Sequence, residues 1–204
     1  MIVDLNSLST GQVYMTMIQT LIPRPVAWVL SENSDSGFNL APFSYFNAVC
    51  SDPPMIMFSV SMQQDGSAKD TRANIEARDE FVVHIAHRDM ARYVTESSAN
   101  LPPGKSEVEE LELELNEFPA SRLPKLADAR IAYACKLDHI QEIGNNKTSL
   151  IFGRVNALYV ADEVVAEDAK GRRVYAAEKI DPIGRLGGGE YTTFGEKIYI
   201  PRPK

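Results

Sequence analysis

Ile22-Pro-Arg-Pro-Val-Ala-Trp-Val29 and Asn39-Leu-Ala-Pro-Phe-Ser-Tyr-Phe-Asn47 are two extended stretches in the first quarter of this chain. The β-branched and aromatic run Val26–Leu30 is typical of a strand, and the polar cluster Ser31–Gly37 after it is typical of a hairpin turn. We therefore expect an extended return over residues 38–49. Pro42 has no backbone N–H to give to a neighbouring strand, which predicts an edge strand or a bulge there.

The rest of the chain contains further strand-like runs and a few helical patterns. The strand-like runs cover residues 55–61, 80–86, 130–141 and 148–161, the last two joined by the turn Gly144-Asn-Asn146. The helical patterns cover residues 70–78, 89–99 and 107–117. About six strands with short helices predict a mainly β fold with α insertions, a Greek-key barrel that is closed or nearly closed. At this length we expect one domain, residues 1–204.

The helix predicted at residues 107–117 has the clearest sequence pattern of the three. Ser106 and Glu109 match a capping box, apolar residues follow at helical spacing, and Pro119 stops the pattern. Six glutamates in this stretch could suggest a cation site, but a solvated face of a surface helix is the better interpretation.

Composition excludes several classes of protein. The chain has 204 residues, 44% of them hydrophobic, and a formal net charge of −7, so a disordered chain and a nucleic-acid-binding groove are both disfavoured. No apolar run approaches the length of a membrane span, and no basic residue of a secretory signal precedes Arg24. Cys50 and Cys135 form no CxxC pair, which predicts buried thiols in a reducing cytoplasm.

Lys69-Asp-Thr71 begins the helix predicted at residues 70–78. The first turn of a helix leaves backbone N–H groups unpaired and favours an anion, so a lysine and a threonine there could complete a phosphate cradle. The alternative is ordinary capping by Asp70 or Thr71, with Lys69 in solvent.

Gly184-Arg-Leu-Gly-Gly-Gly189 is rich in glycine, but no buried strand precedes it and no apolar helix follows it. A dinucleotide-binding Rossmann motif is therefore excluded. Two interpretations stay open, a flexible loop and a loop whose Arg185 closes over an anionic or aromatic ligand.

Other catalytic signatures are weak. His84 and His87 are three apart in or beside a strand, where they face opposite sides, so we expect no shared metal ion. No Gly-x-Ser-x-Gly elbow occurs, and no residue stands out as a nucleophile or general base. A phosphate cradle and a ligand loop without an acid–base pair indicate a protein whose cofactor does the chemistry.

The two opening stretches together resemble the flavin reductase-like family of FMN-binding split barrels, which contains flavoredoxin and the reductase components of two-component monooxygenases. The resemblance covers most of the chain, from about Tyr14 to Pro203. It continues through Ser51-Asp-Pro-Pro54, Lys69-Asp-Thr-Arg-Ala-Asn-Ile75, Phe81-Val-Val83, Ala134-Cys-Lys136, Ile151-Phe-Gly-Arg-Val155 and Pro182-Ile-Gly-Arg-Leu-Gly-Gly188 with Tyr191.

This resemblance implies a homodimer with one FMN per subunit in a groove near the dimer interface. It implies that the isoalloxazine lies along Ser44, Tyr45, Phe46 and Asn47, with Ser59 and Ser61 close by. It further implies that Lys69 and Thr71 hold the phosphate, that Arg24 contacts the phosphate or ribityl region, and that Arg185 and Tyr191 close the site.

The chain departs from the family pattern at His84, where asparagine is usual, and matches it least over residues 92–126. We expect this segment to cover the site and to help choose the electron donor or acceptor.

Two functions follow from the resemblance. The first is an enzyme in which NAD(P)H reduces bound FMN, which then reduces an acceptor such as free flavin, ferric iron or a monooxygenase partner. The second is an electron carrier of the flavoredoxin kind, reduced by a protein partner.

Overall fold

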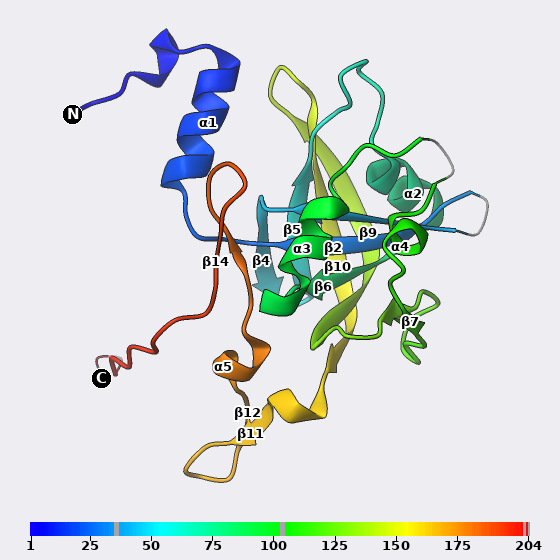
Figure 1. Ribbon diagram of the computed structural model, residues 1–204, viewed down its shortest axis with the longest axis vertical. Coiled ribbons are helices and arrows are strands. Elements are labelled where there is room, and N and C mark those ends of the chain that lie inside the picture. The colour runs from blue at the N-terminus through cyan, green and yellow to red at the C-terminus, as the bar shows by residue number, and fades with distance from the viewer. Residues whose placement is uncertain (35–36, 103–104, 202, 204) are drawn as a thin grey trace.

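A computed structural model describes residues 1–34, 37–102, 105–201 and 203 of the chain. Its main feature is one antiparallel sheet of seven strands in the order β3-β2-β6-β9-β10-β5-β4 (Figure 1). These strands are β2 (Ala27–Glu32), β3 (Phe38–Phe43), β4 (Phe46–Ser51), β5 (Pro54–Val60), β6 (Glu80–Ile85), β9 (Ile131–Ile143) and β10 (Thr148–Val160).

The two edge strands of this sheet, β3 and β4, follow each other directly in the chain. Only Ser44 and Tyr45 separate them, and the Tyr45 carbonyl accepts a hydrogen bond of 2.9 Å from the Ser59 N–H of β5. The sheet therefore curls until its two edge strands come together at this junction, in line with the predicted barrel, although the described strands β3 and β4 do not pair along their lengths. Pro42 lies in the edge strand β3, as predicted from its missing N–H.

Both faces of the central strand β2 are buried, which explains its unbroken apolar run. Val29 faces the barrel interior together with Phe43, Phe58 and Phe81, and the Phe58 ring contacts the other two rings. Trp28 and Leu30 face the other side, which residues 86–132 cover. The covering elements are η2 (Arg88–Met90), α3 (Ala91–Glu96), α4 (Glu107–Glu110), β7 (Leu115–Asn116) and β8 (Lys125–Leu126).

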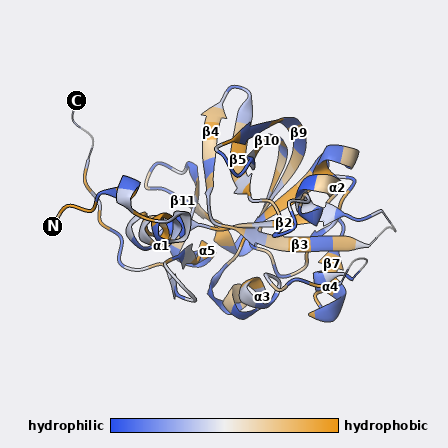
Figure 2. Ribbon diagram, turned by 90° about the horizontal axis from the view of Figure 1, so that it is seen from above, coloured by the Kyte–Doolittle hydropathy of each residue, from blue (hydrophilic) through white to orange (hydrophobic). Residues whose placement is uncertain are grey.

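The remaining elements surround the barrel (Figure 1). They are η1 (Leu5–Ser7), α1 (Thr10–Thr20), β1 (Arg24–Pro25), α2 (Asp70–Arg78), η3 (Asp162–Val164), β11 (Val165–Glu167), β12 (Arg173–Tyr175), α5 (Ala177–Ile180), β13 (Gly184–Arg185) and β14 (Tyr191–Thr192). Strands β1, β13 and β14 form a separate small sheet. Helix α1, which the sequence analysis did not predict, is held away from the barrel, and of its residues only Ile18 is buried (Figure 2).

The predicted strands and the helix at residues 70–78 are confirmed, with three corrections elsewhere. The extended return over residues 38–49 is two strands, broken at Ser44 and Tyr45. The helix expected at residues 89–99 is a short 3-10 turn followed by α3. The β2–β3 hairpin forms as predicted, although Asp35 and Ser36 of its turn lie outside the described residues.

The third correction concerns the helix predicted at residues 107–117, which ends at Glu110. Glu112 adopts a left-handed φ of 52°, and the Leu113 N–H donates to the Val108 carbonyl, so the chain turns back toward β7. The predicted solvated face is also wrong at one residue, because Glu107 is buried and its carboxylate accepts a hydrogen bond of 2.9 Å from the Leu40 N–H.

Candidate functional site

The junction between β3 and β4 brings five of the predicted site residues together. Ser44 and Tyr45 form the junction itself, and Phe46 lies opposite Phe58 in the register of β4 and β5. The hydrogen bond from Ser59 to Tyr45 holds β5 against this point. From Asn47 onward β4 is exposed along its length. The junction is therefore a backbone corner that β5 holds in place and that leads into an exposed strand.

Arg24 lies next to this junction, and its guanidinium forms hydrogen bonds with the junction, with the end of α1 and with the segment at Leu186. Its Nη1 donates to the carbonyls of Ile18 and Leu21 at 2.6 and 2.8 Å, where α1 ends and leaves carbonyl groups unpaired. Its Nη2 donates to the Leu186 carbonyl at 3.0 Å and its Nε to Ser44 Oγ at 3.4 Å. The buried guanidinium thus positions Ser44, and four of its donor contacts go to the protein itself.

The glycine-rich stretch near the C-terminus forms the hairpin β13–β14 beside Arg24. Arg185 lies opposite Arg24 in one strand pair and opposite Tyr191 in the other, with its guanidinium 4.5 Å from the centre of the Tyr191 ring. Its Nη2 donates to the Gly188 carbonyl at 2.6 Å, whereas its buried Nη1 has no hydrogen-bond partner within the described part of the chain. A buried guanidinium donor without a partner is a place for an acceptor atom of a ligand.

The hairpin also contacts the segment that matches the family least. The Tyr191 hydroxyl lies 3.0 Å from Thr95 Oγ1 of α3, so either group can donate to the other. Residues 92–126 otherwise cover the outer face of the sheet through apolar side chains that include Val94 and Phe118. This segment therefore reaches the site through α3, at one predicted residue.

The start of α2 contradicts the capping interpretation, while the phosphate cradle stays a prediction. Lys69, which is half-buried, is the N-cap residue, and no side chain caps the helix, so capping by Asp70 or Thr71 is wrong. The Thr71 hydroxyl is instead buried and accepts a hydrogen bond of 2.8 Å from Asn39 Nδ2. The backbone N–H groups of the first turn are thus left without a side-chain acceptor, with a lysine beside them.

Ser61 lies on the loop between β5 and α2 and lines a cavity of about 700 Å³. The other walls come from Tyr14 and the N-terminal end of α1 and from the β9–β10 turn at residues 145–148. A cavity of this size accommodates an organic ligand. The α1 wall was missed by the sequence analysis, although Ser9 and Gln12 form a capping box, a pattern that predicts a helix start.

The structure therefore divides the eleven predicted residues into groups. Hydrogen bonds or strand register connect most of them in one region, namely Arg24, Ser44, Tyr45, Phe46, Asn47, Ser59, Arg185 and Tyr191. Ser61 lies two residues beyond Ser59, on the cavity wall. No hydrogen bond between described residues joins Lys69 or Thr71 to the others.

His84, the departure from the family pattern, is part of the core. Its Nδ1 lies 3.1 Å from the Trp28 carbonyl and therefore donates to it, while Nε2 accepts from the Leu126 N–H at 3.1 Å. Complete burial lowers the pKa of His84 to about 4. A neutral imidazole thus joins β6 to β2 on one side and to β8 on the other.

The two cysteines have different environments. Cys135 is buried as predicted, and burial raises the pKa of its thiol. Cys50 is exposed on β4, so its predicted burial is wrong in this chain. Within the described residues no three or more His, Cys, Asp and Glu side chains are grouped as a metal site would require. Among the same residues, no helix is both long and apolar enough to cross a membrane.

Comparison with known proteins identifies the class to which this split barrel belongs. The sequence profile described as "Flavin reductase like domain" matches residues 19–183. Nitrilotriacetate monooxygenase component B from Bacillus cereus is similar with a TM-score of 0.89 and 34% identity over 98% of both chains. The 2-nitrobenzoate 2-nitroreductase of Pseudomonas fluorescens is similar with a TM-score of 0.87 and 29% identity, covering 100% of this chain and 96% of the other.

A protein from Shewanella frigidimarina described as having a split barrel domain shares the fold, with a TM-score of 0.82 and 19% identity over 97% of this chain and 96% of its own. The chain is a mostly β split barrel of the flavin-binding class. It belongs to the flavin reductase-like domain family. The predicted fold class and the predicted family are both confirmed.

Proposed function

We propose that this protein binds FMN and is an NAD(P)H-dependent flavin reductase. The observation that carries the proposal is the family membership, together with 34% identity over nearly the full length to a protein named as a monooxygenase component. Bound FMN would supply the redox chemistry by accepting a hydride from NAD(P)H and passing the electrons to an acceptor. The residues of the chain bind and orient the reactants.

The groups at the site fit such a cofactor. The uncapped start of α2 and Lys69 offer backbone N–H donors and a cation to a phosphate. The backbone at Ser44–Asn47 and the side chain of Ser59 would lie along the ring system. The unpartnered Nη1 of Arg185 would donate to a ring or ribityl oxygen, with Tyr191 beneath its guanidinium. Thr71 would support the phosphate site through Asn39 rather than by direct contact.

A donor without a domain of its own must reach the flavin directly. Because β4 is exposed beyond Phe46, a nicotinamide ring could stack on a flavin face that the barrel leaves open. This explains how NAD(P)H could react although the chain has no Rossmann motif. We propose a monooxygenase component as one acceptor, in line with the name of one similar protein, nitrilotriacetate monooxygenase component B.

We further propose that the protein is a homodimer with FMN near the interface. Several large apolar side chains of α1 and the segment after it are exposed, as is Val49 of β4. The exposed ones on the first segment are Tyr14, Met15, Met17, Leu21 and Ile22. Both surfaces adjoin the proposed flavin site, and a second copy of the chain would cover them.

The test is anaerobic stopped-flow reduction of the FMN-loaded protein by NADH and, separately, by NADPH. Rapid loss of the flavin absorbance with either donor, after chromatographic identification of FMN in the purified protein, is the expected result. Reduction by a reduced partner protein alone would instead establish the electron-carrier function. A protein that is colourless and takes up no FMN would contradict both functions.

A further inference from the structure

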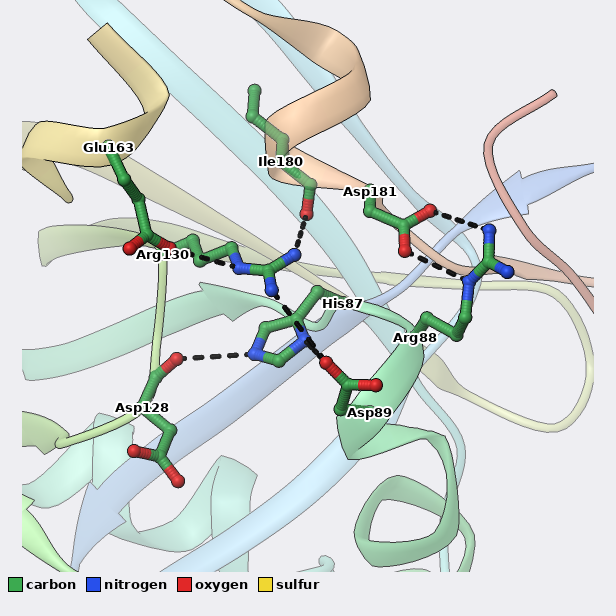
Figure 3. Close-up of polar contacts among 8 residues, drawn as sticks. All are labelled: His87, Arg88, Asp89, Asp128, Arg130, Glu163, Ile180 and Asp181. Carbon is green, nitrogen blue, oxygen red and sulfur yellow. Dashed lines mark hydrogen bonds and ion pairs between the residues drawn. The ribbon is translucent and has the colours of Figure 1, made fainter. Parts of the chain in front are cut away.

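A second cavity, of about 330 Å³, lies apart from the proposed flavin site, between η2, the start of β9 and η3. Its polar wall consists of His87, Asp89, Asp128, Arg130 and Glu163 (Figure 3). Its apolar wall consists of Met90, Tyr93 and Leu113. None of these eight residues belongs to the predicted flavin site.

The hydrogen bonds of His87 determine what this cavity offers to a ligand. The imidazole is 93% buried as a side chain, since only 7% of it is exposed. Its Nε2 lies 3.2 Å from the Asp128 carbonyl, which can only accept, so Nε2 carries the hydrogen. In the neutral ring Nδ1 is then an acceptor, and this buried atom has no hydrogen-bond partner among the described residues.

The group that faces Nδ1 cannot supply the missing hydrogen. Asp89 Oδ2 lies 3.5 Å away, and a carboxylate oxygen also only accepts. When the His87 ring is neutral, two acceptors thus lie 3.5 Å apart with no hydrogen between them, and a donor from a ligand can serve both (Figure 3). Asp89 is itself 76% exposed as a side chain, so it can adjust to an arriving ligand.

The charges of the cavity wall favour a cation. Asp89 and Glu163 provide two carboxylates, whereas Arg130 is the one cation among the described residues that line this wall. Asp128 presents its backbone carbonyl to His87, and its carboxylate acts on Lys125 instead. The guanidinium of Arg130 makes only long contacts, 3.4 Å to Glu163, 3.4 Å to the Ile180 carbonyl and 3.7 Å to Asp89. The neighbouring Arg88 is already paired with Asp181 through two hydrogen bonds of 2.9 and 3.1 Å. The wall thus keeps an excess of negative charge and of acceptors.

We propose that this cavity binds a small organic ammonium ion with an apolar body. A protonated primary amine carries three N–H donors, so it can donate to His87 Nδ1 and to the Asp89 carboxylate beside it at once. Its hydrocarbon or aromatic body lies against Met90, Tyr93 and Leu113, where the Tyr93 ring adds a cation–π contact. A divalent metal is disfavoured, because no three His, Cys, Asp or Glu side chains among the described residues converge as metal ligands do.

The test titrates the full-length, flavin-loaded protein with benzylammonium and follows the histidine ring nitrogens by NMR. Benzyl alcohol and benzoate serve as neutral and anionic probes of the same shape. We expect benzylammonium to shift the His87 Nδ1 resonance and to bind at least roughly tenfold more tightly than benzyl alcohol, since its hydrogen bonds are charge-assisted. The flavin absorbance should not change.

Two isosteric variants, Asp89→Asn and Glu163→Gln, should each weaken benzylammonium binding roughly tenfold. Asp138→Asn is the matched control, because Asp138 carries the same charge but pairs with Arg154 and His139 elsewhere on the surface. The proposal is overturned if benzyl alcohol binds as tightly as benzylammonium, or if Asp138→Asn weakens benzylammonium binding as much as the cavity variants do. It is also overturned if benzylammonium binds without shifting the His87 Nδ1 resonance. Binding of cobalt(II) at His87 that excludes benzylammonium would overturn it too.

Discussion

Lys69 and Thr71 are two positions apart at the start of α2, yet their side chains have different surroundings. We expect Lys69→Ala to weaken FMN binding roughly tenfold, because it removes a charge-assisted contact to the phosphate. The free energy of unfolding should hardly change. Thr71→Ala should instead lower the free energy of unfolding by about 1 kcal/mol, since buried Asn39 loses its 2.8 Å hydrogen bond.

Flavin fluorescence titrations and urea unfolding separate the two effects. Thr71→Ser keeps the hydroxyl and should behave as the wild type in both measurements. Lys136→Ala is the control for lost positive charge, because Lys136 is exposed on β9. Wild-type FMN affinity in Lys69→Ala would refute the phosphate assignment.

His84 makes stability depend on pH in a defined direction. The unfolded chain takes up a proton near the ordinary histidine pKa of 6.5, but the folded chain does so only near 4. The contribution of His84 to stability is therefore complete above pH 6.5 and is lost as the pH falls toward 4, with an upper limit of about 3 kcal/mol. Urea unfolding at several pH values should show a shallower loss in His84→Gln than in the wild type. His139→Gln, which removes an exposed histidine, is the control and should lose nearly as much stability at low pH as the wild type. If stability falls equally steeply with pH in His84→Gln and in the wild type, His84 does not cause the pH dependence.

At the scale of elements, α4 protects the exposed edge of β3. Ser106 Oγ donates to the Phe38 carbonyl at 2.6 Å, and Glu107 accepts from the Leu40 N–H, so two side chains replace the neighbouring strand that β3 lacks. Burial disfavours the charged form of the Glu107 carboxyl and therefore raises its pKa. A short helix with two well-placed side chains thus closes the edge of the barrel.

Substitutions of Glu107 should distinguish its hydrogen bond from its charge. Glu107→Ala leaves the buried Leu40 N–H without an acceptor and should lower the free energy of unfolding by about 1–3 kcal/mol. Glu107→Gln keeps an acceptor oxygen and should stay close to the wild type at neutral pH. As the pH falls through the raised pKa, the wild type should gain stability relative to Glu107→Gln. Urea unfolding of both variants measures these changes. If Glu107→Ala and Glu107→Gln lower the free energy of unfolding equally, the hydrogen bond to the Leu40 N–H does not contribute as we expect.

The elements that could be predicted from sequence are those whose side chains face a core. The apolar run in β2 marks a strand buried on both faces, and residues 70–78 have helix signals that match α2. Helix α1 was missed because Tyr14, Met15 and Met17 face away from the barrel, so its apolar pattern points to no core in this chain. Residue spacing alone predicted too long a helix after Ser106. The left-handed turn at Glu112 redirects the chain, and the strand β7 that follows pairs with β8.

The candidate site was predictable to a similar extent and for similar reasons. The predictions at Ser44–Asn47 and Lys69 came from the resemblance and the helix start, which are local in sequence. The function of Arg24 depends on where α1 ends and where Leu186 returns, and these segments meet only in the folded chain. A net charge of −7 also says little about a phosphate site, because a helix start and one lysine act at close range.

At the scale of the whole molecule, the remaining question is what covers α1 and β4. Helix α1 projects from the barrel on the side of β4 (Figures 1 and 2), with Met17 40% and Val49 48% exposed. If a second copy covers both, the double variant Met17→Glu and Val49→Glu places charges in the interface and should yield monomers. Its FMN affinity should fall as well, because the flavin site adjoins that interface. Light scattering during size-exclusion chromatography gives the mass, and Leu158→Glu, which changes an equally exposed leucine on β10, should stay dimeric. A wild-type protein that elutes as a monomer with FMN bound would contradict the proposed dimer and leave the flavin site to a single chain.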